Sequence, residues 1–341
     1  MPASRVTAGS AGPLGQAGSA AVSANPASLE DAMVRAATMY YDQGATMELI
    51  ARRLGTSRST VSRLLKRARE TGLVEINIHL PGSETVGVAR RLAARFGVQA
   101  HIVPVQRGAA ESEVLDQVSR AAGRLLPSLL EPGQTVGVAW GVTTAAVARN
   151  TPPHPIPGLT LVQLNGSTTV ASSGLDYAGD ILSRLAAAFD ASVLAFPVPA
   201  FFDYKETRQA MWRERSVRRV LTAQAGAALA LFSVGAPGGE VRSHVYVGGY
   251  LDTADRASLE RDGVVGDVCT VFLRADGTFG GIELNARASG PTPALLAAIP
   301  RRVCVVAGRH KAVATLAALR AGVVTDLVVD EPTAGAIDAL L

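Results

Sequence analysis

Seven basic residues lie between positions 52 and 69 with no acidic residue among them: Arg52, Arg53, Arg58, Arg63, Lys66, Arg67 and Arg69. The rest of the chain has 26 Lys and Arg residues against 29 Asp and Glu residues, and therefore carries about −3. A basic cluster on an otherwise mildly acidic chain is typical of a surface that binds a polyanion. A solvated helix face is the alternative for such a cluster taken alone.

The polar and basic residues of this segment are of types that bind DNA. Hydroxyl and guanidinium groups form hydrogen bonds with phosphates and with base edges. The candidates for base contacts are Arg58, Ser59, Ser62 and Arg63. Phosphate contacts, which supply the salt-dependent part of affinity, are assigned to Arg52, Arg53, Lys66 and Arg67. Ser57 and Thr60 complete the predicted DNA-binding surface.

Three predicted helices would position this surface. An apolar stripe spaced i, i+3, i+4, i+7 is typical of a helix with one buried face. Two such stripes are Met47, Ile50, Ala51 and Leu54, followed by Val61, Leu64, Leu65 and Ala68. Thr46 and Ser57 are the predicted N-caps of these two helices, and Gly55-Thr56 makes the turn between them. An earlier helix is expected from Leu29 to Gly44, with Met33, Ala36, Ala37 and Tyr40 on its buried face.

The last two of these helices form a pattern that is known from DNA-binding proteins. A short helix, a tight turn and a polar, basic second helix predict a helix-turn-helix whose second helix enters the major groove. Alternating apolar residues over 73–80 predict a strand that would form a wing. Because one such unit offers little contact area, a dimer on a palindromic site is expected. The alternative is a helical subdomain that packs without touching DNA.

A second group of residues has the chemistry of an anion site. Gly141, Thr143 and Thr144 follow a predicted strand over 135–140 and open a predicted helix. Free N–H groups and hydroxyls at a helix N-terminus favour an anion such as phosphate. Lys311, in the first turn of a helix predicted over 312–319, would add a full positive charge. An ordinary structural turn and an exposed lysine are the alternatives.

Further polar residues could bind hydroxyl groups. Asn165 and Gly166 follow a predicted strand over 159–164, and open α/β sheets bind ligands at the carboxyl ends of their strands. Asp267 follows the glycine-containing segment 263–266, where we expect a turn. Its carboxylate would accept hydrogen bonds from a sugar or would cap that turn.

Nothing in the sequence has the spacing of a catalytic or metal site. No two of the candidate carboxylates have a spacing that by itself indicates acid–base catalysis, and the five histidines are scattered; these carboxylates are Asp176, Asp203, Asp267 and Glu283. The two cysteines, Cys269 and Cys304, are too few for a disulfide framework, and neither is near a second metal ligand. We therefore predict no catalytic residue, metal or cofactor. An enzyme is the alternative from another functional class.

The chain divides into four predicted parts. A tail over 1–28 has too few large apolar residues to fold, and the DNA-binding module over 29–80 follows it. A linker over 81–83 leads to an α/β domain over 84–341, in which helices alternate with short strands of a largely parallel sheet. No apolar run reaches the roughly 20 residues of a membrane helix, and no signal peptide precedes the module, so we expect no membrane association and a cytoplasmic protein.

These segments together resemble the SorC family of bacterial sugar-metabolism regulators. The resemblance rests on MVRAATMYYDQGATMELIARRLGTSRSTVSRLLKRARETGLVEI, VGVAWGVTTAAVA, LVQLNGS, GVVGDV, AGRHKAVATLAALRAG and LVVDEPTA, in this order. It implies a winged helix-turn-helix followed by a Rossmann-like domain related to sugar-phosphate isomerases. Because of that relation, a sugar-phosphate isomerase-like enzyme with an accessory DNA-binding module is the alternative to a regulator. It also implies dimers or tetramers on operator DNA. His310, immediately before the lysine, departs from the family's usual pattern.

The resemblance also assigns the effector site. It implies a phosphorylated sugar or polyol, with the phosphate at Gly141, Thr143, Thr144 and Lys311 and the sugar nearer Asn165, Gly166 and Asp267. The sequence as a whole therefore predicts a regulator of a carbohydrate or polyol operon, in which effector binding changes operator affinity. A nucleic-acid packing protein is disfavoured, because the basic charge is confined to one module.

Overall fold

The computed structural model describes residues 26–74, 84–106, 108–168 and 175–341, which fall into two compact units, Met1–Pro81 and Gly82–Leu341. The predicted tail up to residue 25, the wing strand from 75 onward and the linker 81–83 lie outside the described residues. No helix in the described part of the chain is long and apolar enough to cross a membrane.

The first unit is a three-helix module. Its helices are α1 (Pro26–Ala37), which continues as a π-helical turn (Thr38–Asp42), α2 (Met47–Leu54) and α3 (Arg58–Glu70). The two predicted apolar stripes face one another, with Ile50, Val61 and Ala68 fully buried between the helices. The helix-turn-helix predicted from their spacing is confirmed.

The first helix differs from the prediction in which residues near its end are buried. Its described part runs from Pro26. At the other end Met39 is buried, whereas Tyr40 is 36% exposed and packs edge-on against Tyr41. The prediction that Tyr40 is buried was wrong, because a π-helical turn spaces side chains around the axis differently from an α-helix.

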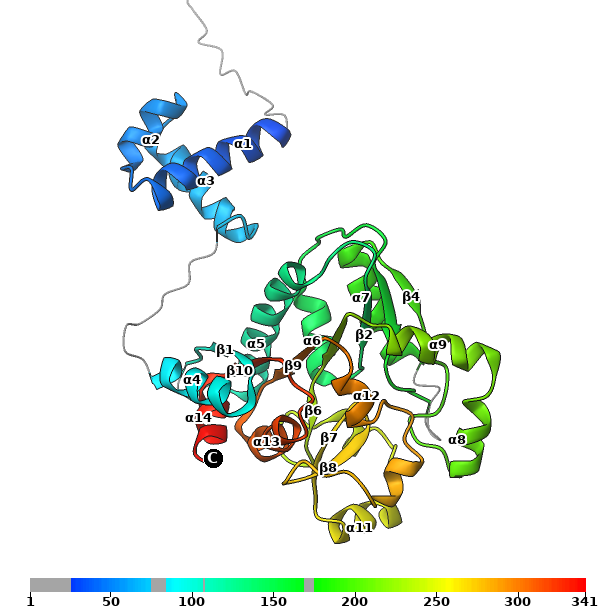
Figure 1. The fold of residues 1–341 in the computed structure, drawn as a ribbon. Coiled ribbons are helices and arrows are strands. Elements are labelled where there is room, and N and C mark those ends of the chain that lie inside the picture. The colour runs from blue at the N-terminus through cyan, green and yellow to red at the C-terminus, as the bar shows by residue number, and fades with distance from the viewer. Residues whose placement is uncertain (1–25, 75–83, 107, 169–174) are drawn as a thin grey trace, which may run out of the picture. The chain divides into compact units, whose positions relative to one another are not determined.

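The second unit is built on a seven-stranded parallel sheet in the order β1-β10-β9-β5-β2-β3-β4 (Figure 1). Its strands are β1 (Gln99–Val103), β2 (Thr135–Val138), β3 (Thr160–Gln163), β4 (Ser192–Leu194), β5 (Leu229–Phe232), β9 (Arg301–Val306) and β10 (Asp326–Asp330). The predicted α/β domain with a parallel sheet is confirmed. The strand order reverses at β2, because β3 and β4 lie on one side of it and β5 on the other.

Both faces of this sheet are buried. Side chains alternate between the faces, so Val303 and Val305 of β9 join one apolar core while Cys304 and Val306 join the other. The first core is covered by α5 (Glu111–Leu125), α6 (Val142–Asn150) and α7 (Leu175–Phe189). The second is covered by α4 (Glu84–Phe96), α13 (Ala312–Arg320) and α14 (Glu331–Asp338). The sequences of these strands are therefore nearly continuous runs of apolar residues.

A smaller antiparallel sheet lies beside the main one and contains β6 (Val234–Gly235), β7 (Val264–Val268) and β8 (Val271–Arg274). The remaining helices are α8 (Lys205–Met211), α9 (Arg215–Ala225), α10 (His244–Val247), α11 (Thr253–Arg261) and α12 (Pro293–Ala297), and short 3-10 turns cover Leu126–Leu129, Glu283–Ala286 and Arg309–Lys311. Asp267 was expected to follow a glycine turn. The turn is at Gly263, and Asp267 is inside β7.

Candidate functional site

The predicted DNA-binding residues lie on the exposed side of the helix-turn-helix. Both predicted caps are present, since Thr46 Oγ1 accepts a hydrogen bond from Leu49 N at 3.3 Å and Ser57 Oγ from Thr60 N at 3.1 Å. Gly55 closes the turn with φ +62°, a left-handed backbone that glycine adopts at no cost. These local bonds fix where α3 begins and therefore which of its residues face outward.

All ten predicted side chains except that of Thr60 are exposed to solvent; Thr60 is half-buried, and its Oγ1 lies 2.9 Å from Ser57 Oγ. Arg58 Nη1 forms an ion pair with Glu48 Oε1 at 3.0 Å, and Lys66 Nζ lies 3.7 Å from Glu70. Such exposed pairs are weak, so a phosphate or a base can replace the acidic partner. The face is therefore open, polar and basic, as a recognition helix requires.

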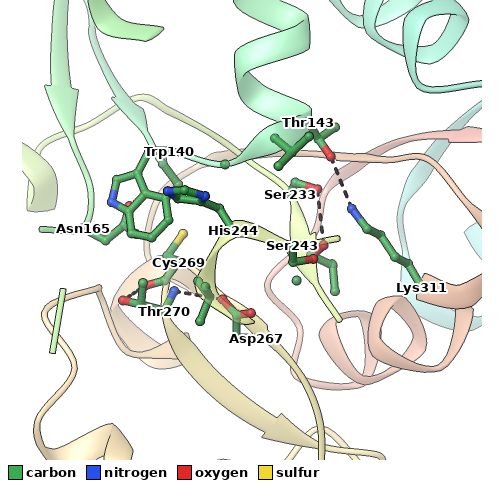
Figure 2. A pocket seen from close by; sticks show the side chains of 16 residues that line it. Trp140, Thr143, Asn165, Ser233, Ser243, His244, Asp267, Cys269, Thr270 and Lys311 are labelled. Carbon is green, nitrogen blue, oxygen red and sulfur yellow. Dashed lines mark hydrogen bonds between the residues drawn. The ribbon is translucent and has the colours of Figure 1, made fainter. Parts of the chain in front are cut away.

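A pocket lies at the carboxyl ends of β2, β3 and β5, where the small sheet meets the main one (Figure 2). It is narrow, with about 40 Å³ of room for solvent inside about 420 Å³ of space that includes its open mouth. Five of the predicted effector-binding residues line it: Gly141, Thr143, Asn165, Asp267 and Lys311. The fold thus brings together residues as far apart in the sequence as 141 and 311.

One end of the pocket is suited to an anion. Thr143 lies in the first turn of α6, and Lys311 Nζ donates to its Oγ1 at 3.4 Å (Figure 2). The lysine is only 3% exposed, and this burial lowers its pKa below the usual value, although Cys304 and Asp267 oppose the shift. Among the described residues the ammonium group has this one long hydrogen bond, and a buried ammonium group with so little compensation is a strong candidate for an anion ligand.

Asp267 is fully buried at another part of the pocket wall. Its Oδ2 accepts a hydrogen bond from Thr270 N at 3.2 Å, which caps the tight turn between β7 and β8. Its Oδ1 has no partner among the described residues. Burial raises the pKa of Asp267 to about 7, against the opposing effects of the Thr270 bond and of Lys311. The carboxyl group therefore has one structural oxygen and one oxygen free for a ligand.

Asn165 provides a second unpaired acceptor, since its buried Oδ1 also has no partner in the described part of the chain. The segment that carries it is held from the side by Trp140, whose Nε1 donates to the Gly166 carbonyl at 2.8 Å. Tyr250 stacks on the Trp140 ring with 5.0 Å between centroids and donates its hydroxyl to Ser167 O at 3.0 Å. Unpaired buried acceptors in a polar pocket can bind hydroxyl groups.

Two of the predicted residues do not line the pocket. Thr144 is buried, and its hydroxyl donates to the Gly141 carbonyl at 3.2 Å, which supports the bend before α6. Gly166 N donates to Ser289 Oγ at 2.9 Å, and a Cβ on Gly166 would lie 2.3 Å from the Val198 carbonyl. Position 166 therefore requires glycine because its backbone packs closely against that of Val198, rather than because it contacts a ligand.

Sequence reasoning missed part of the pocket wall. Ser233, Ser243, His244 and Thr270 also line the pocket, and Trp140 had been assigned only to a strand. His244 stands against the ring of Tyr177 with 4.4 Å between centroids, and burial lowers its pKa. Ser233, Ser243 and Thr270 lie in short loops and turns, and His244 begins the four-residue helix α10, which is too short for a periodic pattern. Only Trp140, a polar aromatic residue at a strand end, gave a usable signal. Among the described residues, no three potential metal ligands cluster.

Comparison with known proteins agrees with this geometry. Residues 82–337 match the family model described as "Putative sugar-binding domain", and residues 37–78 match the MarR family. The chain is 29% identical over 309 residues to the "Deoxyribonucleoside regulator" of Bacillus subtilis, which covers 89% of this chain and 96% of that protein.

Two solved structures are also similar. A domain of "a possible sugar-binding transcriptional regulator" from Arthrobacter aurescens is 42% identical with a TM-score of 0.70, and the match covers 76% of this chain and 99% of that one. The full-length sorbitol operon regulator SorC from Klebsiella pneumoniae is 25% identical with a TM-score of 0.73, and the match covers 90% of this chain and 98% of that one.

Proposed function

This chain belongs to the sugar-binding-domain family of transcriptional regulators, and we propose that it is a DNA-binding regulator whose operator affinity is set by a phosphorylated sugar or polyol. The observation that carries the phosphate assignment is the buried Lys311 ammonium beside Thr143 at the start of α6. A phosphate there would restore the lysine charge that burial disfavours and would accept the free N–H groups of the helix.

The sugar hydroxyls would then meet the acceptors that have no partner. Asp267 Oδ1 and Asn165 Oδ1 both border the same pocket as Lys311. The interior volume of about 40 Å³ holds only one or a few water molecules, so an effector must widen the pocket as it enters. The effector therefore binds the widened conformation of the domain more tightly than the narrow one. This difference in affinity shifts the equilibrium between the two conformations.

The phosphate assignment can be tested by calorimetric titration of the full chain with sugar phosphates, sugar-alcohol phosphates and the matching unphosphorylated compounds. We expect binding of a phosphorylated compound only, and about a tenfold or greater loss of affinity in Lys311→Met. Lys205→Met, at an exposed lysine of α8, is the matched control and should bind as the unchanged protein does. Equal affinity for phosphorylated and free sugars would show that the pocket is not an anion site.

We propose that the protein binds a palindromic operator as a dimer or a tetramer. Selection of binding sites from random DNA by the full chain should therefore yield an inverted repeat.

Operator binding should not depend on Lys311. Lys311→Met should bind the selected DNA as tightly as the unchanged protein but should not respond to the effector. Loss of both properties would mean that Lys311 holds the fold.

We propose that the pocket binds its ligand without turnover, because no acid–base pair was recognised in the sequence and the relatives are named as regulators. Incubation with ribose 5-phosphate or glucosamine 6-phosphate tests this directly. Isomerisation well above the background rate would favour the alternative of an enzyme with a DNA-binding module.

A further inference from the structure

The loop over 236–243 borders the pocket through Ser243, and it is anchored at Ala236, which belongs to one apolar core, and at Val241, which packs against the other. It joins β6 to α10, and the residues at its two ends, Gly235, Ser243 and His244, line the pocket. Its base is closed by Ala236 N, which donates to Ser243 Oγ at 2.9 Å. The tip, residues 237–240, is exposed and has no helix or strand. A segment of this kind opens at low free-energy cost unless something else holds it.

Glu111, the first residue of α5, holds this loop from outside the pocket. Its Oε2 accepts a hydrogen bond from Val241 N at 2.8 Å, and its Oε1 lies 3.0 Å from Nδ1 of His310. Burial alone would raise the pKa of Glu111, but the bond from Val241 and the charge of His310 outweigh it and hold the pKa below the usual value. The carboxylate therefore joins two segments that are about 70 residues apart in sequence, and it does so without lining the pocket.

His310 completes the contact on the other side. Its ring is largely buried and lies directly against two glycines, because a Cβ on Gly239 would be 2.4 Å and a Cβ on Gly308 2.7 Å from the ring. The next residue is Lys311, whose ammonium group is the proposed phosphate ligand. The tip of the loop is thus attached, through Glu111 and the His310 ring, to the backbone that carries the lysine.

We infer that Glu111 is a positioning residue that clamps the loop over 236–243 to His310, and that this clamp sets how long a sugar phosphate stays in the pocket. The inference rests on the proposed function, since it concerns release from the same site. Release through the border of a pocket requires the border to open, so removal of the clamp should act mainly on the dissociation rate.

The test compares Glu111→Ala, Glu111→Gln and Glu113→Ala in the full chain. Glu113 is the matched control, because it lies in the same turn of α5 and its carboxylate has one hydrogen-bond partner among the described residues, the N–H of the cap residue Ala110, at 3.2 Å. Hydrogen exchange of the loop amides, without any ligand, reports the clamp itself. Dissociation of ribose 5-phosphate, with inorganic phosphate as a second probe for the anion end alone, reports its effect on the effector.

We expect Glu111→Ala to exchange the Val241 amide faster and to release ribose 5-phosphate about tenfold faster, the size of one lost charged hydrogen bond. Glu111→Gln keeps a carbonyl acceptor for Val241 and should recover most of both properties, which a general loss of folding would not allow. Glu113→Ala should match the unchanged protein.

Two results would overturn the clamp. The first is unchanged loop exchange in Glu111→Ala, and the second is faster exchange with a release rate equal to that of Glu113→Ala. If the unchanged protein binds neither these probes nor any sugar phosphate or sugar-alcohol phosphate of the calorimetric titration, the proposed effector class fails and the effect on residence time falls with it. The exchange comparison still decides whether Glu111 holds the loop.

Discussion

At the scale of single residues, Asp267 is a carboxyl group in a site that disfavours its charge. It is buried, one of its oxygens has no hydrogen-bond partner in the part of the chain that the structure describes, and burial raises its pKa from 3.8 to about 7. The folded protein therefore binds a proton at this residue between about pH 4 and pH 7, whereas the unfolded chain does not. The contribution of Asp267 to the free energy of unfolding consequently falls as the pH rises through this range.

Asp267→Asn should remove this dependence. Asn keeps an acceptor for Thr270 N but has no proton to lose. Between pH 4 and pH 7, the free energy of unfolding of the unchanged protein should therefore fall by about a few kcal/mol relative to that of the variant. Urea unfolding of both proteins at several pH values measures it. A constant difference between them would show that the carboxyl group titrates at an ordinary pKa.

The limits of sequence reasoning are clearest at residues that are held by distant partners. Thr46 and Ser57 could be predicted as caps because each bonds to the residue three positions later. Thr143 and Lys311 could be suspected separately, but their 3.4 Å contact depends on the order of the strands between them. Glu111 could not be found, because its two partners at 241 and 310 leave no local pattern.

At the scale of elements, the pairing of β6 with β7 places Gly235 opposite Asp267. A Cβ on Gly235 would lie 2.0 Å from Asp267 Oδ1 and would displace the carboxylate from the pocket. The sequence indicated a parallel sheet from its alternating helices and strands, but the second, antiparallel sheet has only short strands. For that reason its register, and with it the environment of Asp267, could not be predicted.

Gly235→Ala should therefore weaken effector binding and cost about 1–3 kcal/mol of stability through overpacking. Gly179→Ala is the control, because that glycine lies inside α7 with nothing within 4 Å of the added Cβ, and alanine there should be neutral or slightly stabilising. Thermal unfolding and effector titration of both variants provide the comparison. If the two variants had equal unfolding temperatures and equal effector affinities, β6 would be able to shift away from Asp267 at little cost.

At the scale of the whole molecule, the positive charge is concentrated where DNA would bind. The seven basic residues between positions 52 and 69 lie on α2 and α3, and the remainder of the chain carries about −3. A uniform attraction to DNA is therefore not a property of the whole chain, and specificity must come from the residues of α3 that reach base edges. Arg63 is exposed on this helix, and so is Arg69 in its last turn.

Arg63→Ala and Arg69→Ala remove the same charge from the same helix, and only Arg63 is predicted to contact a base. Arg63→Ala should weaken binding to the selected operator by about 1–3 kcal/mol, with a smaller loss on scrambled DNA. Arg69→Ala should weaken both complexes slightly and equally, because distant phosphate attraction does not depend on sequence. Fluorescence anisotropy at one fixed salt concentration measures all four affinities. If Arg63→Ala lowered both affinities by the same factor, Arg63 would be a phosphate contact and the base-reading residues of α3 would have to be sought among Arg58, Ser59 and Ser62.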